Sequence, residues 1–428
     1  MFWLYNLLIF FTAPIWIPWM VIRSRRRKEQ PNWRERFGDF GFQLQAKTPR
    51  VWIHAVSVGE VVAALPILQA IKRVPDAPEI VLSVTTSSGY QTARDRATEW
   101  VDRIVYFPID VPLFQFGGLT RVRPRVVAIM ETELWFNFLY AAKLLDATTM
   151  LVNGRISDRS FPRSRRLRFF YKSLLRLVDR CLMQTPTDAD RIQALGARPE
   201  SVAILGNCKY DQALLAPKKS AEQWRKELGI ESDQRVIVIG STREPEEDEL
   251  VISALQRVVG PGITVIYAPR HLERADAIAA LWESKIGTPM ARRSQKETGP
   301  ALLLDTYGEL GEVYQLAHVA IIGGGFAATG GQNLIQPLGL GVPVLHGPHM
   351  HNFAEATRAA LKSGASRECS DAESLAQALS ELVTDPDVHG RMSEAARAMT
   401  QSSLGASQRY ADAILAAVRA NPGFQRKR

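Results

Sequence analysis

Cysteine is scarce in this sequence. Only three cysteines occur in the 428 residues, and they lie far apart, at Cys181, Cys208 and Cys369. So few cysteines exclude a disulfide framework and a cysteine-rich zinc site, and they fit a reducing compartment. A chain of this length buries enough apolar surface to fold without such cross-links.

Signatures of metal and dinucleotide enzymes are missing as well. The sequence has no HExxH motif, and its histidine cluster at His346, His349 and His351 is interrupted by a Gly-Pro turn that suits zinc poorly. The glycine run 323–325 is not part of a GxGxxG motif followed by an acidic residue. We therefore expect no metal and no cofactor.

Positive charge is concentrated in two blocks. The net charge is +9, but residues 1–50 carry +6 and residues 159–180 carry +7, which leaves −4 for the rest of the chain. A nucleic-acid-binding protein usually carries positive charge along the surface of its folded body. Basic blocks beside apolar segments instead favour an anionic membrane surface as a partner, and no nucleic acid.

The N-terminal apolar run is long enough to cross a membrane. No charged side chain occurs between Phe2 and Ile22, and about 20 helical residues cross a bilayer core. Basic residues 23–28 follow directly, which favours a cytoplasmic body. A cleaved signal peptide would carry its positive charge before the run. We expect an uncleaved anchor with a basic flank in residues 1–28, and Pro14 and Pro18 leave open a kinked or partly embedded helix.

The second basic block has a helical pattern. Between residues 165 and 178 apolar side chains recur on one face, with arginines and a lysine around them. Such a helix is either an ordinary solvated surface helix or one that lies on anionic lipid headgroups.

The rest of the chain alternates strand-like and helix-like segments, which predicts an α/β fold with two Rossmann-like, doubly wound domains facing a cleft. Apolar runs typical of buried parallel strands occur at residues 51–58, 79–86, 103–110, 124–132, 149–155, 180–185, 201–207, 235–242, 264–270, 301–308, 319–326 and 342–347. The expected organisation is an anchor (1–28), an N-terminal domain (29–211), a linker (212–228), a C-terminal domain (229–395) and helices (396–428) that can pack back on the first domain.

Acidic motifs follow two strands of the first half. The segment 54–60 leads from a strand through a turn at Gly59, and it places Glu60 in the first turn of a helix. Glu60 either complements the helix dipole or acts as a general base, and its placement alone does not decide. The segment 131–135 places two carboxylates beside aromatic residues. That is either a capped helix with an aromatic core face or an acceptor site bordered by an apolar wall for a lipid.

In the second half of the chain, residues that can bind phosphate follow three of the predicted strands. The glycine-rich segment 323–331 follows an apolar strand, and its backbone N–H groups can cradle phosphate. Arg270 and His271 follow another strand, where cations can clamp a phosphate or a carboxylate. Ser241 and Thr242 follow a third strand, as N-caps that can also donate to phosphate.

Taken together, these motifs resemble the 3-deoxy-D-manno-octulosonic acid (Kdo) transferase family of lipopolysaccharide assembly. The resemblance covers nearly the whole chain in order, through the anchor and the segments 34–38, 54–60, 131–137, 153–157, 206–209, 240–242, 269–271, 305–310 and 347–353. It implies a two-domain glycosyltransferase of the B type at the cytoplasmic face of the inner membrane. The implied reaction moves Kdo from CMP-Kdo to a sugar hydroxyl of a lipid A precursor, with inversion at the anomeric carbon and no metal.

The resemblance also implies roles for individual residues. Glu60 is the catalytic general base. The acceptor is bound by Ser57, Gly59, Glu133 and Trp135. The donor is bound by Ser241, Thr242, Arg270, His271, Gly324, Gly325, Asn333 and Gln336.

The sequence departs from the family pattern mainly on the donor side. Gln332 replaces a histidine, and Gln336 replaces a glutamate expected to bind the nucleotide ribose; the other replacements are Arg243, Pro245 and Phe136. A glutamine can still bind a hydroxyl but loses a charge-assisted bond, worth about 1 kcal/mol more. Two alternatives stay open: a transferase of the same fold with another nucleotide-sugar donor, and a catalytically silent paralogue that binds lipid.

Overall fold

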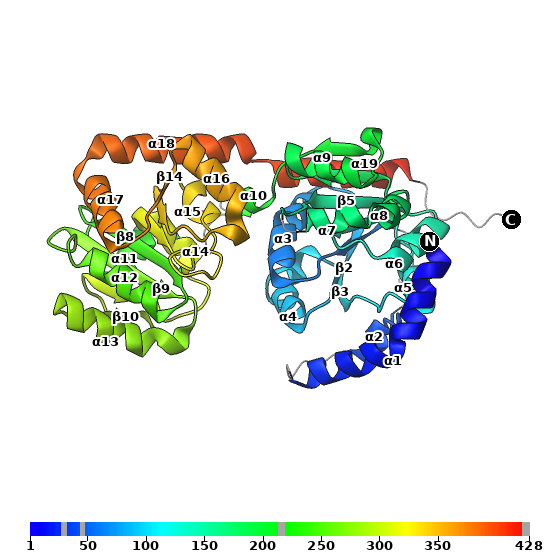
Figure 1. Cartoon of the computed structure of the whole chain (residues 1–428), viewed down its shortest axis with the longest axis horizontal. Helices are drawn as coiled ribbons and strands as arrows, with labels where there is room; N and C mark the ends of the chain where they lie inside the picture. Colours follow the sequence, from blue (N-terminus) through cyan, green and yellow to red (C-terminus); the bar gives the residue numbers. More distant parts are fainter. Residues whose placement is uncertain (27–31, 43–47, 159, 213–218, 422–428) are drawn as a thin grey trace. The chain divides into compact units, whose positions relative to one another are not determined.

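The computed structural model describes the chain except residues 27–31, 43–47, 159, 213–218 and 422–428. The chain forms two compact units (Figure 1). The first unit comprises Met1–Asp211 and Gly405–Arg428, and the second comprises Gln212–Leu404. The chain therefore completes the second unit and then returns to the first.

The first unit is built on a parallel sheet of seven strands in the order β3-β2-β1-β4-β5-β6-β7. All seven apolar runs expected in this half contain a strand, and the central strands are buried on both faces, which explains their continuous hydrophobicity. The chain reverses its direction of travel across the sheet between β1 and β4, so this pair forms the topological switch point. The strands are β1 (Arg50–His54), β2 (Glu79–Val84), β3 (Arg103–Tyr106), β4 (Val126–Met130), β5 (Thr148–Gly154), β6 (Arg180–Met183) and β7 (Val202–Ile204).

Helices cover both faces of this sheet. On one face, α3 and the C-terminal α19 share a core with β1 and β2, and Tyr410 and Ile414 of α19 are fully buried there. The helices of the unit are α1 (Phe2–Arg26), α2 (Trp33–Arg36), α3 (Val58–Lys72), α4 (Ser87–Arg96), α5 (Pro112–Val122), α6 (Phe136–Leu144), α7 (Phe161–Arg166), α8 (Arg168–Leu175), α9 (Pro186–Leu195), α10 (Lys209–Gln212) and α19 (Ala406–Ala420).

The second unit repeats the plan with the strand order β10-β11-β9-β8-β12-β13-β14. The five expected strands are present, and the prediction of two doubly wound α/β domains is confirmed. The edge strands β10 and β14 were not expected, because they are only two and three residues long and partly polar. The strands are β8 (Arg235–Thr242), β9 (Ile263–Pro269), β10 (Ala291–Arg292), β11 (Ala301–Leu303), β12 (Ala317–Ile322), β13 (Val344–His346) and β14 (Ser366–Glu368).

The second unit extends beyond the expected domain, residues 229–395, at both ends. Part of the expected linker, 213–218, lies outside the described residues, but 221–228 forms α11, whose Trp224 is buried and donates to Glu312 Oε2 at 3.1 Å. At the other end, α18 carries the unit past residue 395 to Leu404. The helices are α11 (Ala221–Leu228), α12 (Pro245–Leu255), α13 (Ala275–Ile286), α14 (Leu310–Val313), α15 (Ile335–Gly339), α16 (Ala354–Ser363), α17 (Ala372–Thr384) and α18 (Pro386–Ser403).

The two segments expected at a membrane are both helical. The window Phe2–Trp19 of α1 is long and apolar enough to cross a bilayer by length and composition. The basic segment expected as one helix over 165–178 is instead divided between α7 and α8. The division falls at Leu167, whose N–H closes the last turn of α7 on Ser164 O at 3.0 Å, and its side chain is 51% exposed.

Candidate active site

Three glutamates of the first unit lie together at the switch point of its sheet. Strands β1 and β4 are paired neighbours, so the loops after them start from the same sheet edge. Glu60 lies in the first turn of α3, directly after β1. Glu131 and Glu133 lie between β4 and α6. The topology thus brings together two motifs that are far apart in the chain.

Two hydrogen bonds hold the Glu60 side chain, which is only 7% exposed. The backbone N–H of Val56 donates to Oε2 at 2.9 Å, and the hydroxyl of Ser57 donates to Oε1 at 3.1 Å. Ser57 is the N-cap residue of α3 but makes no side-chain capping bond. Its hydroxyl therefore serves the carboxylate of Glu60 instead of the helix backbone.

The environment of Glu60 favours its protonated form. Burial raises the pKa of Glu60 to about 7, and the charges of Glu131 and Glu133 also raise it, against the lowering effect of its hydrogen bonds. Burial, followed by the charge of Glu131, raises the pKa of Glu133 too. A pKa near ambient pH suits a group that accepts a proton during a reaction. The alternative role of Glu60, complementing the dipole of α3, does not require a buried carboxylate.

Glu131 connects the acidic motif to a cation. Its backbone is in the left-handed region, with φ of 56°, a conformation that is costly for a residue with a side chain. Its carboxylate Oε1 lies 3.4 Å from Lys209 Nζ, and both side chains are half-buried. Sequence reasoning did not assign Lys209 to the site, because no local pattern indicates that α10 meets the loop after β4.

Gly59 and Trp135 border the carboxylate cluster in different ways. Gly59 lies in the regular first turn of α3 and does not have a positive φ. A Cβ atom at Gly59 would meet only Ser57 Oγ, at 4.0 Å, so the surface beside Glu60 is open. The indole Nε1 of Trp135 is buried without a hydrogen-bond partner in the described part of the chain, and such a group is costly unless a ligand satisfies it.

The glycine-rich loop of the second unit packs directly on the end of β8. A Cβ atom on Gly323 would lie 2.5 Å from the Thr242 backbone, so only glycine fits. Ser241 adopts the left-handed conformation, with φ of 64°, and Thr242 is fully buried. Gly324 and Gly325 continue the loop, and Gly324 also has a positive φ. The structure therefore brings Ser241, Thr242 and the glycine loop together. The expectation that Ser241 and Thr242 are N-caps is wrong, because both still belong to β8 and the N-cap residue of α12 is Glu244.

A buried glutamate that sequence reasoning missed supports this loop. Glu247 lies in the first turn of α12 and is 1% exposed. Its Oε2 accepts from the N–H of Arg243 at 2.9 Å, and its Oε1 accepts from the N–H of Phe326 at 3.2 Å. Burial raises its pKa. The clue in the sequence is its position, since Glu247 follows β8 as Glu60 follows β1.

Arg270 is the exposed cation beside this loop. Its N–H donates to Thr242 O at 2.9 Å, which ties the end of β9 to the end of β8. Among the described residues its guanidinium forms no ion pair, and its side chain is exposed. The neighbouring His271 lies half-exposed, 3.8 Å from Glu273.

Asn333 and Gln336 lie at the start of α15. The Oδ1 of Asn333 accepts from the N–H of Ile335 at 3.0 Å, so this side chain helps to begin the helix. The amide of Gln336 lies against α14, where a Cβ added to Gly311 would approach its Nε2 to 3.3 Å. Gln336 is half-buried, and its side-chain amide makes no hydrogen bond with another described residue.

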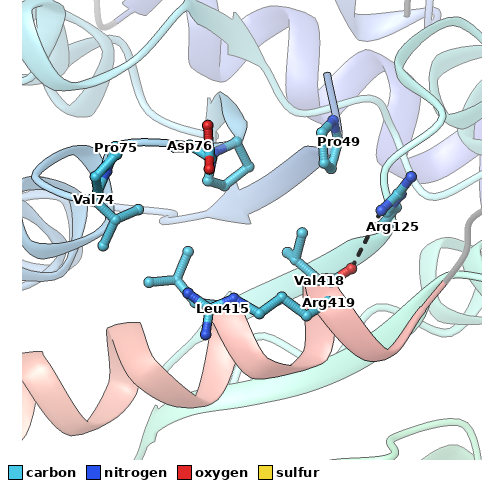
Figure 2. Close-up of a pocket in the computed structure, with 9 residues that line it drawn as sticks. Pro49, Val74, Pro75, Asp76, Arg125, Leu415, Val418 and Arg419 are labelled. Carbon is cyan, nitrogen blue, oxygen red and sulfur yellow. Dashed lines mark hydrogen bonds between the residues drawn. The ribbon is translucent and has the colours of Figure 1, made fainter. Parts of the chain in front are cut away.

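A cavity of about 310 Å³ in the first unit lies at the wrong edge of the sheet to belong to this site. Figure 2 shows Leu415, Val418 and Arg419 of α19 facing Pro49 and Val74 across it. Pro49 precedes β1 and Val74 precedes β2, so the cavity adjoins the amino ends of the strands. Ligands of open α/β sheets bind at the carboxyl ends, where Glu60 lies.

Known proteins resemble this chain in sequence and in fold. Residues 31–212 match the family model described as 3-Deoxy-D-manno-octulosonic-acid transferase (kdotransferase). The 3-deoxy-D-manno-octulosonic acid transferase of Bordetella pertussis is 36% identical over 96% of this chain and 98% of its own length. That of Haemophilus influenzae is 28% identical over 90% of this chain and 92% of its own length.

Solved structures of low sequence identity have the same architecture. The UDP-GlcNAc 2-epimerase of Neisseria meningitidis has a TM-score of 0.62 at 13% identity, over 87% of this chain and all of its own. A glycosyltransferase of Rickettsia africae has a TM-score of 0.58 at 12% identity, over 88% of this chain and all of its own. These likenesses concern the fold, whereas the near-complete match to the Bordetella pertussis protein concerns the family. The chain belongs to the 3-deoxy-D-manno-octulosonic acid transferases, a family of glycosyltransferases.

Proposed function

We propose that the protein transfers Kdo from CMP-Kdo to a sugar hydroxyl of a lipid A precursor in lipopolysaccharide biosynthesis. The transfer proceeds with inversion at the anomeric carbon and without a metal ion. Family membership supports Kdo as the transferred sugar. The observation that carries the mechanism is the buried Glu60, whose pKa is raised to about 7 at the carboxyl end of β1.

Glu60 acts as the general base in this proposal. The acceptor hydroxyl oxygen forms a bond to the anomeric carbon of Kdo while the bond from that carbon to the CMP phosphate oxygen breaks. The hydroxyl proton passes to the carboxylate of Glu60, and CMP leaves with the bonding electron pair. Attack from the side opposite the leaving group inverts the configuration. The Val56 N–H and the Ser57 hydroxyl hold the carboxylate in place for this transfer.

The acceptor lies beside Glu60 on the surface that Gly59 leaves open. The unpaired indole N–H of Trp135 donates to an acceptor oxygen. Glu133 binds an acceptor hydroxyl, and its charge helps to keep the pKa of Glu60 high. Ser57 contributes by fixing the base.

The donor is bound by the second unit. Arg270 supplies the positive charge for the CMP phosphate or the Kdo carboxylate, and His271 lies next to it. Backbone N–H groups at Gly324 and Gly325, with the hydroxyls of Ser241 and Thr242, stabilise the charge that develops on the leaving phosphate. Asn333 and Gln336 bind the nucleotide ribose.

The reaction takes place at the cytoplasmic face of the inner membrane, with α1 as the anchor. The apolar window Phe2–Trp19 supports membrane association. So does the chemistry of the acceptor, because the acyl chains of a lipid A precursor remain in the bilayer while its sugar is modified.

The test is the mass shift of a tetra-acylated lipid A precursor incubated with detergent-solubilised protein and freshly prepared CMP-Kdo. We expect Kdo increments with the wild type and none with Glu60→Gln. Glu222→Gln is the matched control, because Glu222 is also in the first turn of a helix but is exposed. Loss of transfer in both variants, or in neither, would contradict the role of Glu60.

The second candidate is the same reaction with a different nucleotide-sugar donor. The observation in its favour is Gln336, which stands at the expected ribose position without a hydrogen bond to another described residue. A panel of nucleotide sugars tests it: transfer from another donor, with none from CMP-Kdo, would replace the first proposal. Failure to bind any nucleotide would favour the silent paralogue.

A further inference from the structure

The start of α1 is fixed to the first unit by a buried polar joint. Asp110, which is 7% exposed, accepts from the Tyr5 hydroxyl at 2.9 Å and from the backbone N–H of Phe138 at 3.0 Å. The side-chain amides of Asn6 and Asn137 pair with each other at 2.8 and 2.9 Å, and Asn137 also donates to Asp110 O. We refer to Tyr5, Asn6, Asp110 and Asn137 as the Asp110 joint.

Aromatic packing surrounds this joint. The ring of Phe2 stacks on Tyr140 at 4.2 Å, and the ring of Tyr5 stacks on Phe136 at 5.4 Å. Phe170 of α8 lies 5.8 Å from Tyr5. The first two turns of α1 are therefore packed on α6 and α8 as part of the folded unit.

Within residues 2–19 of α1, the partly covered side chains lie on one stripe and the others are exposed. The partly covered residues Phe2, Tyr5, Asn6, Ile9, Ala13 and Trp16 recur every three or four positions, so they form one stripe. The most exposed side chains on the remaining faces are large and apolar: Trp3 at 83%, Phe10 and Ile15 at 73%, and Phe11 at 68%. A contiguous apolar surface of this kind marks contact with lipid or protein.

Helix α2, which follows α1 in the chain, is also bound to the rest of the first unit. In α2, the carboxylate of Glu35 accepts from the N–H of Tyr106 at 2.7 Å, and Arg36 donates to Thr85 O and lies over the Tyr106 ring. The start of α1 and the chain at α2 are thus held by the same folded unit. Between the Asp110 joint and the first basic residue lie residues 7–22, about 24 Å of helix, which is shorter than a bilayer core of about 30 Å.

We propose that α1 lies along the cytoplasmic surface of the bilayer and does not cross it, and that the Asp110 joint thereby holds the acceptor site at the membrane. This inference rests on the proposed membrane association. The occupant of the exposed face of α1 is lipid, because its large side chains are apolar and α8, which contacts α1 through Phe170, continues from α7 in a segment with four arginines and one lysine. Pro14 and Pro18 lie inside α1, which curves in Figure 1.

The joint also reaches the acceptor site through α6. Asp110 accepts from the first N–H groups of α6, and the segment just before α6 carries Glu133 and Trp135. Trp135 in turn lies 6.0 Å from Phe107, whose ring stacks on His54 at 3.9 Å. Tyr5 and Asp110 are therefore positioning residues, which set where α1, and with it the bilayer, lies relative to the place where the acceptor binds.

Topology is tested with a single cysteine placed before Met1 in a short polar extension. The natural cysteines Cys181, Cys208 and Cys369 are all buried, so they leave a low background. A membrane-impermeant maleimide is applied to spheroplasts and to inside-out vesicles. We expect labelling only in the vesicles, because Met1 stays on the cytoplasmic side. Labelling in the spheroplasts would show that α1 crosses the membrane and would overturn the proposal.

The positioning role is tested with Tyr5→Phe, which removes one hydroxyl from the joint. Tyr140→Phe is the matched control, because the Tyr140 ring also packs on α1 but its hydroxyl bonds to no described residue. Each variant is assayed with a vesicle-embedded acceptor and with a deacylated, soluble one. We expect Tyr5→Phe to raise KM at least threefold for the embedded acceptor only, and Tyr140→Phe to change neither.

Two results would contradict the positioning role: an equal change for both acceptors, or no change for either. Asp110→Asn is the stronger variant but removes a buried helix cap, so Tyr5→Phe keeps the test independent of folding. The topology experiment needs no turnover. A wild type that is inactive on both acceptors would overturn the proposed function and leave the topology result readable.

Discussion

The two units carry buried glutamates at equivalent places, and the two side chains differ in their hydrogen-bond partners. Glu60 follows β1 and Glu247 follows β8, each in the first turn of a helix. Each accepts from the backbone N–H four residues before it, Val56 in one case and Arg243 in the other. The two units thus repeat one strand-to-helix design.

The second oxygen of each carboxylate makes the difference. In Glu247 it accepts from the backbone N–H of Phe326, so both oxygens are committed to holding the glycine loop. In Glu60, among the described residues, it accepts only from the hydroxyl of Ser57, which can rotate away, as the proposed role of Glu60 requires. Two further carboxylates raise the pKa of Glu60. Burial alone therefore does not distinguish the proposed base from Glu247; the side-chain partner of its second oxygen does.

The largest expected effect comes from Glu60→Gln. Loss of the base should lower kcat/KM by about 10²- to 10⁴-fold. Because the pKa of Glu60 is raised to about 7 in the folded state, ionisation costs folding stability as pH rises through 7, and glutamine removes this cost. The free energy of unfolding at pH 8 should therefore be unchanged or higher by about 1–3 kcal/mol. Activity assays measure the loss of kcat/KM, and denaturant titrations measure the free energy of unfolding. A variant that stays active, or one that is strongly destabilised, would contradict the role of Glu60 as the base.

Arg270→Ala should affect the donor rather than the fold. A hydrogen bond to a charged group contributes about 1.5–3 kcal/mol, so KM for the donor should rise by about 10- to 100-fold. The thermal midpoint should stay constant because the side chain is exposed. Arg257→Ala is the control, since Arg257 is a 60% exposed arginine of the same unit paired with Glu373. Equal effects of the two variants would argue against a donor site at Arg270.

Glu247→Gln should lower the stability of the second unit, whereas Glu60→Gln should lower activity without a loss of stability. One of its two backbone N–H partners would face the NH₂ group of glutamine and lose its acceptor. We expect a loss of about 1–2 kcal/mol in the stability of the second unit, read by hydrogen exchange in the glycine loop. If this variant kept its stability but lost the chemical step, the distinction between the two glutamates would fail.

The smallest expected effect is that of Glu133→Gln on pH dependence. Removing its charge removes one cause of the raised pKa of Glu60, so the rising limb of the activity profile should move to lower pH. At pH 6 the variant should retain a larger share of its maximal activity than the wild type retains of its own. A shift to higher pH would contradict the electrostatic coupling.

Sequence reasoning predicted the features that depend on local pattern. The continuous apolar runs identified both parallel sheets, and Glu60, Ser241 and Arg270 were expected at strand ends, where the structure places them. It missed β10 and β14, which are too short to form a pattern. It also missed Lys209 and Glu247, because their roles depend on partners distant in the chain, the carboxylate of Glu131 and the N–H of Phe326. The Asp110 joint was not predicted for the same reason, since Tyr5 and Asp110 are 105 positions apart in the chain.

The most direct test of the account is the pH dependence of kcat/KM for the wild type with CMP-Kdo and a lipid A precursor. We expect activity that rises with pH and levels off above about 7, because Glu60 must be ionised to accept the transferred proton. We also expect the small residual activity of Glu60→Gln to lack this rise. A wild-type profile that is flat between pH 5 and 8, or the same limb in Glu60→Gln, would contradict the assignment of Glu60 as the base.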